Sequence, residues 1–202
     1  MRRRAVFPLS GILLLVASYP AAAHHVMEGK TPSTFVEGLL SGLGHPIIGI
    51  DHLAFLAAIG IAVGFAKLNL AMPLVFVAAS VLGVGLHVKA FNIPAVETAI
   101  AASVLLAGAL VARGGSIQSS VWFVLFALAG VIHGYAYGES IVGAEPAPLW
   151  AYLCGLTVIQ TLLATGIAML TRNMANPITP RLAGAVVAGI GLAVLAGRML
   201  PA

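Results

Sequence analysis

The sequence is poor in charge and has a single cysteine. Charged residues make up 8% of its 202 positions, hydrophobic residues make up 60%, and the mean hydropathy is +1.07. A water-soluble fold of this length needs a polar exterior that ten basic and six acidic residues cannot provide. The composition therefore excludes a soluble domain and predicts that lipid surrounds most of the surface. The single cysteine, Cys154, excludes an internal disulfide and a thiolate cluster for metal.

The first 23 residues are typical of a cleavable signal peptide. Arg2 to Arg4 precede an apolar run that is too short to span a bilayer, and Ala21 to Ala23 form a small-residue cleavage site. We expect residues 24–202 to form a single polytopic transmembrane domain that begins at His24. The alternative is an uncleaved anchor helix. Removal of the three arginines leaves seven basic residues against six acidic ones, so we expect no nucleic-acid partner.

Six apolar stretches of about 20 residues follow, separated by short polar or Pro/Gly-containing breaks. They predict an all-α integral membrane protein with about six transmembrane helices. The stretches cover residues 35–65, 70–88, 95–112, 121–137, 149–170 and 182–200. An exported amino end followed by six crossings gives a multi-pass protein of the inner membrane whose mature amino terminus faces the periplasm. The bias of basic residues, four inside against three outside, agrees with this orientation.

The first stretch, Phe35 to Phe65, is too long for one straight crossing. At 1.5 Å per residue it would measure about 46 Å, against a hydrocarbon core of about 30 Å. We expect the helix to break near Pro46, where proline removes a backbone donor and neighbouring glycines loosen the chain. Interrupted helices recur at ion sites in transporters. The same stretch has two small-residue pairs that favour close helix packing, Gly38/Gly42 and Gly60/Gly64.

Histidines and carboxylates fall within the apolar stretches, where each is costly unless it is paired, hydrated or liganded. They are His45, Asp51, His52, His87, Glu97, His133 and Glu139. The deepest of them have no Lys or Arg among them, so a cation is the missing partner. Imidazole with carboxylate suits borderline divalent ions such as nickel, cobalt and zinc. His45 and Asp51 are six residues apart, as are His133 and Glu139, which we interpret as two walls of one site.

Plainer structural roles also fit these residues. His87 near an interface can be solvated or bonded to a neighbouring helix, and Glu97 at a helix start can complement the helix dipole. For His45, Asp51 and His52 the alternative is a buried polar network that holds a broken helix. Aromatic residues that resemble interface anchors are Trp122, Tyr137 and Trp150.

Two motifs resemble those of a known family of membrane proteins. His45-Pro46 followed by Asp51-His52 resembles the His-x5-Asp-His signature of the HupE/UreJ nickel and cobalt permeases. The run from His133 to Glu139 is similar to the second motif of that family, but Tyr137 stands where a second histidine is usual and Glu139 comes one position early. The resemblance implies a secondary transporter rather than an enzyme, with Ni²⁺ or Co²⁺ as transported substrate and no resident cofactor.

The predicted central ion site combines Asp51 and His52 with His45, and with His133 and Glu139 from the second motif. A further hypothesis is that cleavage of the signal peptide exposes a free amine at His24, and that this amine captures nickel together with His24 and His25. The alternative is that the two histidines lie beside the cleavage site by accident.

Two other classes of function also fit these residues. Membrane histidines can hold haem in an electron carrier, and His with Asp and Glu can bind zinc in an intramembrane hydrolase. The sequence has no His-Glu-x-x-His or Gly-x-Ser-x-Gly motif for the hydrolase. It does not distinguish nickel from cobalt as the substrate, and it does not reveal proton coupling or the oligomeric state.

Overall fold

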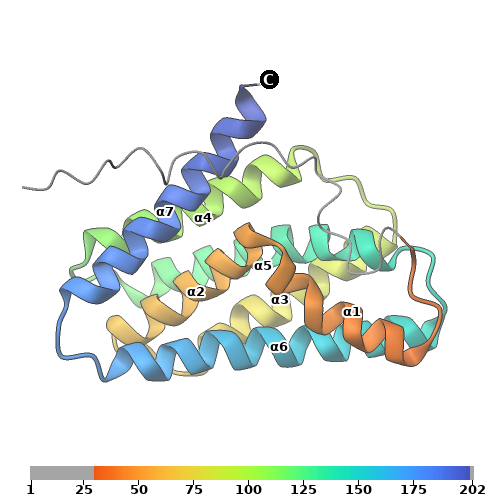
Figure 1. Cartoon of the computed structure of the whole chain (residues 1–202), viewed down its shortest axis with the longest axis horizontal. Coiled ribbons are helices and arrows are strands. Elements are labelled where there is room, and N and C mark those ends of the chain that lie inside the picture. The colour runs from red at the N-terminus through yellow and green to blue at the C-terminus, as the bar shows by residue number, and fades with distance from the viewer. Residues whose placement is uncertain (1–29, 201–202) are drawn as a thin grey trace, which may run out of the picture.

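A computed structural model describes residues 30–200, and the regular elements in this part of the chain are all helical (Figure 1). The helices are α1 (Phe35–Ile48), α2 (Ile50–Phe65), α3 (Pro73–Val88), α4 (Val96–Arg113), α5 (Ser119–Gly138), the 3-10 turn η3 (Glu139–Ile141), α6 (Pro146–Arg172) and α7 (Ile178–Met199). The all-α prediction is confirmed for this range. The predicted signal peptide, His24 and His25 lie outside the described residues.

The first apolar stretch is broken, as predicted, but at Gly49 rather than at Pro46. α1 and α2 meet at an angle of 78°. Gly49 between them has an extended backbone, with φ −74° and ψ 107°, whereas Pro46 lies inside α1. Proline removes one helical hydrogen bond but keeps a helical φ, so the bend falls where a residue leaves the helical region of ψ.

Four helices, α4, α5 together with η3, α6 and α7, are long and apolar enough to cross a membrane, and the bent α1–α2 pair passes the same test when taken together. α3 has 16 residues and falls short of that length. At 1.5 Å per residue it is about 24 Å long, against a hydrocarbon core of about 30 Å. The six predicted apolar segments are therefore five candidate spans and one shorter apolar helix, in a multi-pass membrane protein.

The bent pair packs along α6, and all four glycines of its small-residue pairs lie at this contact. A Cβ atom on Gly38 would lie 2.3 Å from the Pro148 carbonyl oxygen, and one on Gly64 would lie 2.0 Å from Thr171 Oγ1. Because Pro148 and Thr171 lie near opposite ends of α6, the pair follows this helix from one end to the other (Figure 1). That arrangement fits one broken span rather than a loop that returns to the side it entered.

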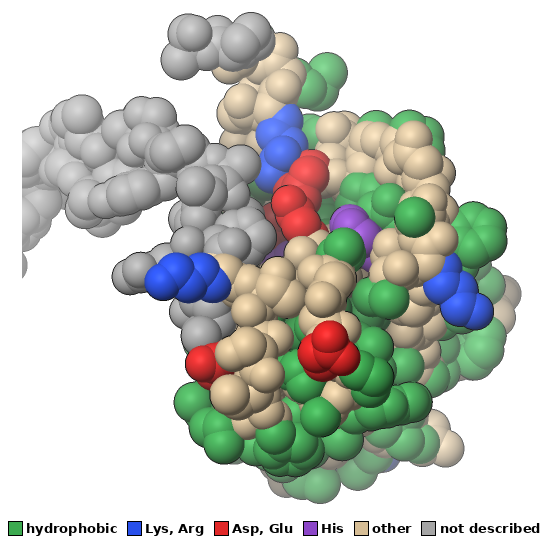
Figure 2. Space-filling model, turned by 90° about the vertical axis from the view of Figure 1, so that its right-hand side faces the viewer, with side chains coloured by type: hydrophobic (Ala, Val, Ile, Leu, Met, Phe, Trp, Pro, Cys, Tyr) green, Lys and Arg blue, Asp and Glu red, His purple; other side chains and the backbone are tan. Residues whose placement is uncertain are grey.

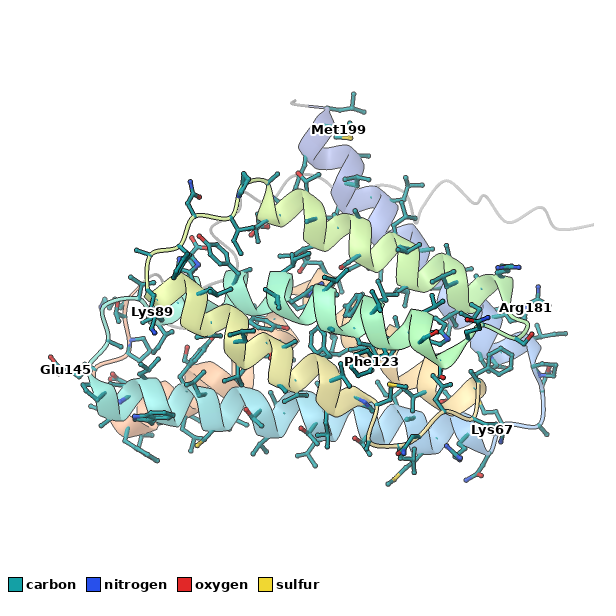
Figure 3. All side chains as sticks on the ribbon, turned by 180° about the vertical axis from the view of Figure 1, so that it is seen from behind. Lys67, Lys89, Phe123, Glu145, Arg181 and Met199 are labelled. Atoms are coloured by element: carbon teal, nitrogen blue, oxygen red, sulfur yellow. The ribbon has the colours of Figure 1, made fainter. Side chains whose placement is uncertain are left out.

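Successive segments run in alternating directions, so the connections gather at two ends of the molecule (Figures 1 and 3). Figure 3 labels Lys67 and Arg181 at one end, which we call the Lys67 end, and Lys89 and Glu145 at the other, the Lys89 end. Two basic side chains at the Lys67 end donate hydrogen bonds to backbone carbonyls of neighbouring segments. Arg172 donates to the Leu68 carbonyl at 2.8 Å, and Arg181 donates to the Ala112 carbonyl at 3.0 Å.

Three apolar clusters lie in the interior of the described residues. The largest occupies the half of the bundle toward the Lys67 end and includes Phe55, Phe76 and Phe126. A second cluster lies toward the Lys89 end and includes Val84 and Ile141, and a third joins α4 to α5. The polar residues described next contact aromatic rings of the first two clusters.

Candidate metal-binding site

Three histidines from three helices meet inside the bundle. His45 in α1, His52 in α2 and His133 in α5 are 3%, 3% and 0% exposed. The ring centroids of His45 and His52 are 5.9 Å apart, and those of His52 and His133 are 5.0 Å apart. On a straight helix His45 and His52 would be separated by about 10 Å along the axis, so the break at Gly49 is what brings them together. We call these three residues the histidine cluster.

His133 is hydrogen-bonded through both ring nitrogens. Its Nδ1 lies 2.9 Å from Nδ1 of His52, and its Nε2 lies 2.9 Å from the hydroxyl oxygen of Ser103 in α4. Ser103 in turn donates to the Ile100 carbonyl at 2.7 Å. The ring of Phe55 packs against His133 with a centroid distance of 4.6 Å. His133 is therefore held from both sides and covered by an apolar ring.

His45 contacts two hydroxyl groups through one nitrogen. Its Nδ1 lies 2.9 Å from the Ser140 hydroxyl and 3.0 Å from the Tyr152 hydroxyl. Tyr152 donates its own proton to the Tyr137 carbonyl at 2.7 Å. The Tyr137 ring lies between the two histidines of the broken helix, with centroids 5.1 Å from His45 and 4.4 Å from His52.

Asp51 is the carboxylate of this site. It is 3% exposed, lies in the first turn of α2, and accepts a hydrogen bond from the backbone N–H of His52 at 2.9 Å. The carboxylate therefore lies at the positive end of the α2 helix dipole. The break at Gly49 thus supplies a new helix amino terminus in the interior of the bundle, which a continuous helix would not have.

Gly49 also makes room for the cluster. A Cβ atom at this position would lie 2.6 Å from Cδ2 of His52, closer than real contacts allow. The absence of a side chain therefore lets the His52 ring fold back against the break. This is a close approach that glycine permits, since the φ of Gly49 is open to any residue.

The remaining predicted residues lie outside the cluster. Glu139 is exposed in η3, Glu97 pairs with Arg198, and Nδ1 of His87 donates to the Tyr135 carbonyl at 2.7 Å. The plainer role of His87, a bond to a neighbouring helix, matches this geometry. Figure 2 shows the Lys89 end, where acidic side chains and a histidine reach the surface.

Sequence reasoning missed the hydroxyl groups of the site and misplaced two aromatic residues. A search for small polar residues inside the apolar stretches would have found Ser103, whereas Ser140 lies in the break after residue 137. Tyr137 and Trp122, expected to anchor at the interface, are 0% and 2% exposed. They are buried because each faces neighbouring helices, while Trp150 is 66% exposed and keeps the predicted surface position.

Within residues 30–200, no three His, Cys, Asp or Glu side chains are arranged so that they could hold one metal ion together. The predicted site is instead a hydrogen-bonded cluster of imidazoles, hydroxyls and one carboxylate. Its donors are nevertheless the nitrogen and oxygen atoms that borderline divalent ions prefer.

Comparison with known proteins finds a family match and a relative of similar length. The family model for HupE / UreJ protein matches residues 12–194. The chain is 32% identical over 190 residues to Protein HupE of Rhizobium leguminosarum bv. viciae, an alignment that covers 91% of this chain and 95% of that protein. No solved structure matches.

Proposed function

This chain belongs to the HupE/UreJ family, and we propose that it is a secondary transporter that carries nickel or cobalt ions from the periplasm to the cytoplasm through the histidine cluster. The observation that carries the proposal is the meeting of three buried histidines with the buried carboxylate of Asp51. The buried polar side chains of the described residues include no Lys or Arg. A divalent cation supplies the counter-charge that such a group of ligands needs inside a membrane.

The position of the cluster supports entry from the Lys89 end. His133 is five residues from the end of α5 at Gly138, about 7.5 Å along the helix axis. The largest apolar cluster separates the histidines from the Lys67 end. An ion that reaches the histidines from the Lys89 end therefore meets an apolar barrier, and its release on the other side requires the surrounding helices to move apart.

The distribution of charge supports an orientation with the Lys67 end in the cytoplasm. This end has four basic residues, which are Lys67, Arg113, Arg172 and Arg181. The acidic residues of the described chain other than Asp51 belong to the opposite half, and they are Glu37, Glu97, Glu139 and Glu145. Basic residues favour the cytoplasmic side, and carboxylates on the periplasmic side attract cations toward the cluster. We assign Glu139 to this entrance rather than to the central site.

The geometry of the cluster does not favour the haem alternative. Two axial histidines must face each other across the plane of the macrocycle. Here Nδ1 of His52 and Nδ1 of His133 are 2.9 Å apart in a direct hydrogen bond, which leaves no space for a haem plane between them. His45 is likewise bonded to the Ser140 and Tyr152 hydroxyls.

Uptake of radioactive nickel and cobalt by a host that lacks its own transporters tests the proposal. Parental cells should accumulate at least one of the two ions. Asp51→Asn keeps the size and hydrogen bonding of the side chain but removes its charge, and we expect uptake to fall by about tenfold or more, a change of about 1.4 kcal/mol. Glu145→Gln makes the same chemical change at an exposed carboxylate of the entrance half, and we expect a much smaller loss of uptake there because solvent screens an exposed charge.

The comparison requires equal amounts of each protein in the membrane. Near-parental uptake by Asp51→Asn would show that Asp51 belongs to a structural polar network only. Absence of nickel and cobalt uptake by the parent would refute the transport proposal as a whole.

A further inference from the structure

Two of the buried polar groups that lack a hydrogen-bond partner within residues 30–200 belong to neighbouring side chains. They are the hydroxyl of Tyr137 in α5 and the amide nitrogen Nε2 of Gln160 in α6. Both side chains are 0% exposed, and the Gln160 amide lies within reach of the Tyr137 hydroxyl. A buried polar group without a partner is destabilising, so two of them side by side need an explanation.

The other end of the Gln160 amide is also unbalanced. Its oxygen Oε1 lies 2.9 Å from Oγ of Ser80 in α3, and the same Oγ lies 2.8 Å from the Val77 carbonyl oxygen. A serine hydroxyl has one proton, so Ser80 cannot donate fully to both oxygens. One end of the amide therefore faces a donor that is already engaged, and the other end has a nitrogen with nothing to bind.

We propose that the Gln160 amide is turned the other way, so that Nε2 donates to Ser80 and Oε1 accepts from the Tyr137 hydroxyl. A half-turn of the amide exchanges its oxygen and nitrogen and needs no movement of any other group. Ser80 then donates only to the carbonyl of its own helix, and each unmatched group gains a partner. In this arrangement Gln160 is a positioning residue that holds the Tyr137 ring as a lid over His45 and His52.

One face of α6 holds both ends of Tyr137. Tyr152, Leu156 and Gln160 follow one another at four-residue intervals, which places them on the same side of the helix. The Tyr152 hydroxyl donates to the Tyr137 carbonyl at 2.7 Å, and Leu156 belongs to the same apolar cluster as Tyr137. Gln160 lies one turn further along this face, where it can bind the hydroxyl at the far end of the Tyr137 ring.

The lid lies on the side of the histidines from which we propose that ions enter. Tyr137 is in the last turn of α5 at the Lys89 end, and its ring centroid is 5.1 Å from that of His45 and 4.4 Å from that of His52. Helical side chains lean toward the amino terminus of their helix, so this hydroxyl points toward the middle of the bundle. Gln160 is near the middle of α6. The role of the lid rests on the proposed function, whereas the hydrogen bonds of Gln160 do not.

NMR of the glutamine side chains tests the orientation of the amide without any transport step. The sequence has two glutamines, Gln118 and Gln160, so carbon-13 and nitrogen-15 labelling of glutamine gives two amide groups, which Gln160→Leu assigns. We expect Ser80→Ala to move the Nε2 signal of Gln160, because it removes the acceptor of that nitrogen. Tyr137→Phe should move the Cδ signal, because it removes the donor to the amide oxygen.

The control for these spectra is Thr161→Val, at the residue next to Gln160. It removes a hydroxyl that is bonded only within α6, to the Thr157 carbonyl, and should move neither signal. A Gln160 amide that ignores Tyr137→Phe would overturn the inference. The reverse pattern, in which Tyr137→Phe moves Nε2 and leaves Cδ in place, would overturn it as well.

Modification of histidines by diethyl pyrocarbonate, followed at each residue by mass spectrometry, tests the lid in the purified protein. Loss of the bond between Tyr137 and Gln160 should make opening of the lid about fivefold more frequent. We therefore expect Gln160→Leu and Tyr137→Phe each to react about fivefold faster than the parent at His45 and His52. The rate at His87, which lies outside the cluster, should stay at the parental value.

The double variant should react no faster than either single variant, since both changes break the same bond. Tyr137→Phe keeps the aromatic ring and removes only the hydroxyl, so it decides the outcome even if Gln160→Leu does not fold. Parental rates at His45 and His52 in Tyr137→Phe would refute the lid.

Uptake of nickel and cobalt separates this inference from the proposed function. A parent that takes up neither ion, but whose Gln160 amide responds to Ser80→Ala and Tyr137→Phe as expected, would refute the proposed function and leave the hydrogen bonds of Gln160 in place. A parent that takes up nickel, but whose Gln160 amide ignores Tyr137→Phe, would refute the present inference alone.

Discussion

A methyl group at Gly42 should damage both the packing of the broken helix and the histidine cluster. Gly42 lies in α1, where a Cβ atom would be 2.1 Å from the Tyr152 carbonyl oxygen and 2.9 Å from the Leu156 backbone nitrogen. Both atoms belong to the backbone of α6 and cannot turn aside as a flexible side chain could. Gly42→Ala therefore forces α1 and α6 apart by about 1 Å, the distance needed to restore an ordinary contact.

That displacement reaches the site because His45 lies one turn beyond Gly42 on the same side of α1. The bond from His45 Nδ1 to the Tyr152 hydroxyl is 3.0 Å long, and an added 1 Å takes it beyond hydrogen-bonding distance. Overpacking costs about 1–3 kcal/mol, and the lost hydrogen bond adds about 1 kcal/mol. We expect a total near 2–4 kcal/mol, which corresponds to a lower Tm by about 5–15 °C for a chain of this size.

Thermal unfolding in one detergent, combined with nickel uptake at equal membrane abundance, measures the two effects. Gly166→Ala is the matched control, because it adds the same methyl group to α6 at a position with no neighbouring atom within 4 Å. We expect the control to unfold at or slightly above the parental temperature, since alanine favours helix. A Gly42→Ala protein that unfolds together with Gly166→Ala would refute the close contact between α1 and α6.

Other predictions concern the amino terminus and the break. Amino-terminal sequencing of the membrane-resident protein should begin at His24, and recovery of residues 2–4 would disprove the signal peptide. A double replacement of His24 and His25 by alanine should reduce uptake at low nickel concentrations only, and parental uptake there would remove their capture role. Gly49→Ala places a methyl group 2.6 Å from Cδ2 of His52, so it should lower uptake and change the nitrogen-15 NMR signals of that ring, and unchanged signals would contradict the geometry.

The sequence predicted the class and the main segments of the fold because these depend on local properties. The length of each apolar stretch predicts a helix that can cross a membrane, and glycines four residues apart predict where two helices approach most closely. Gly38, Gly42, Gly60 and Gly64 all lie against α6, as a packing role requires. The partner of these glycines could not be predicted, since small residues indicate a close approach without saying which helix approaches.

The contacts that the hydroxyl groups make in the site could not be predicted from the sequence, for a different reason. Serine hydroxyls in helices often bond the carbonyls of the same helix. Ser103 does this through the Ile100 carbonyl and contacts His133 as well. The second contact depends on how α4 and α5 meet, which no pattern within either helix records.

The second motif shows why two residue pairs with the same spacing can occupy different positions in space. Six residues separate His45 from Asp51 and His133 from Glu139. Between His45 and Asp51 the helix ends, bends by 78° and begins again, so the carboxylate returns to the interior beside the histidines. Between His133 and Glu139 the chain stays helical up to Gly138, which carries Glu139 about 9 Å along the axis to the exposed end of α5. The break therefore decides which acid joins the cluster, and it leaves Asp51 as the carboxylate able to balance the charge of an ion held there.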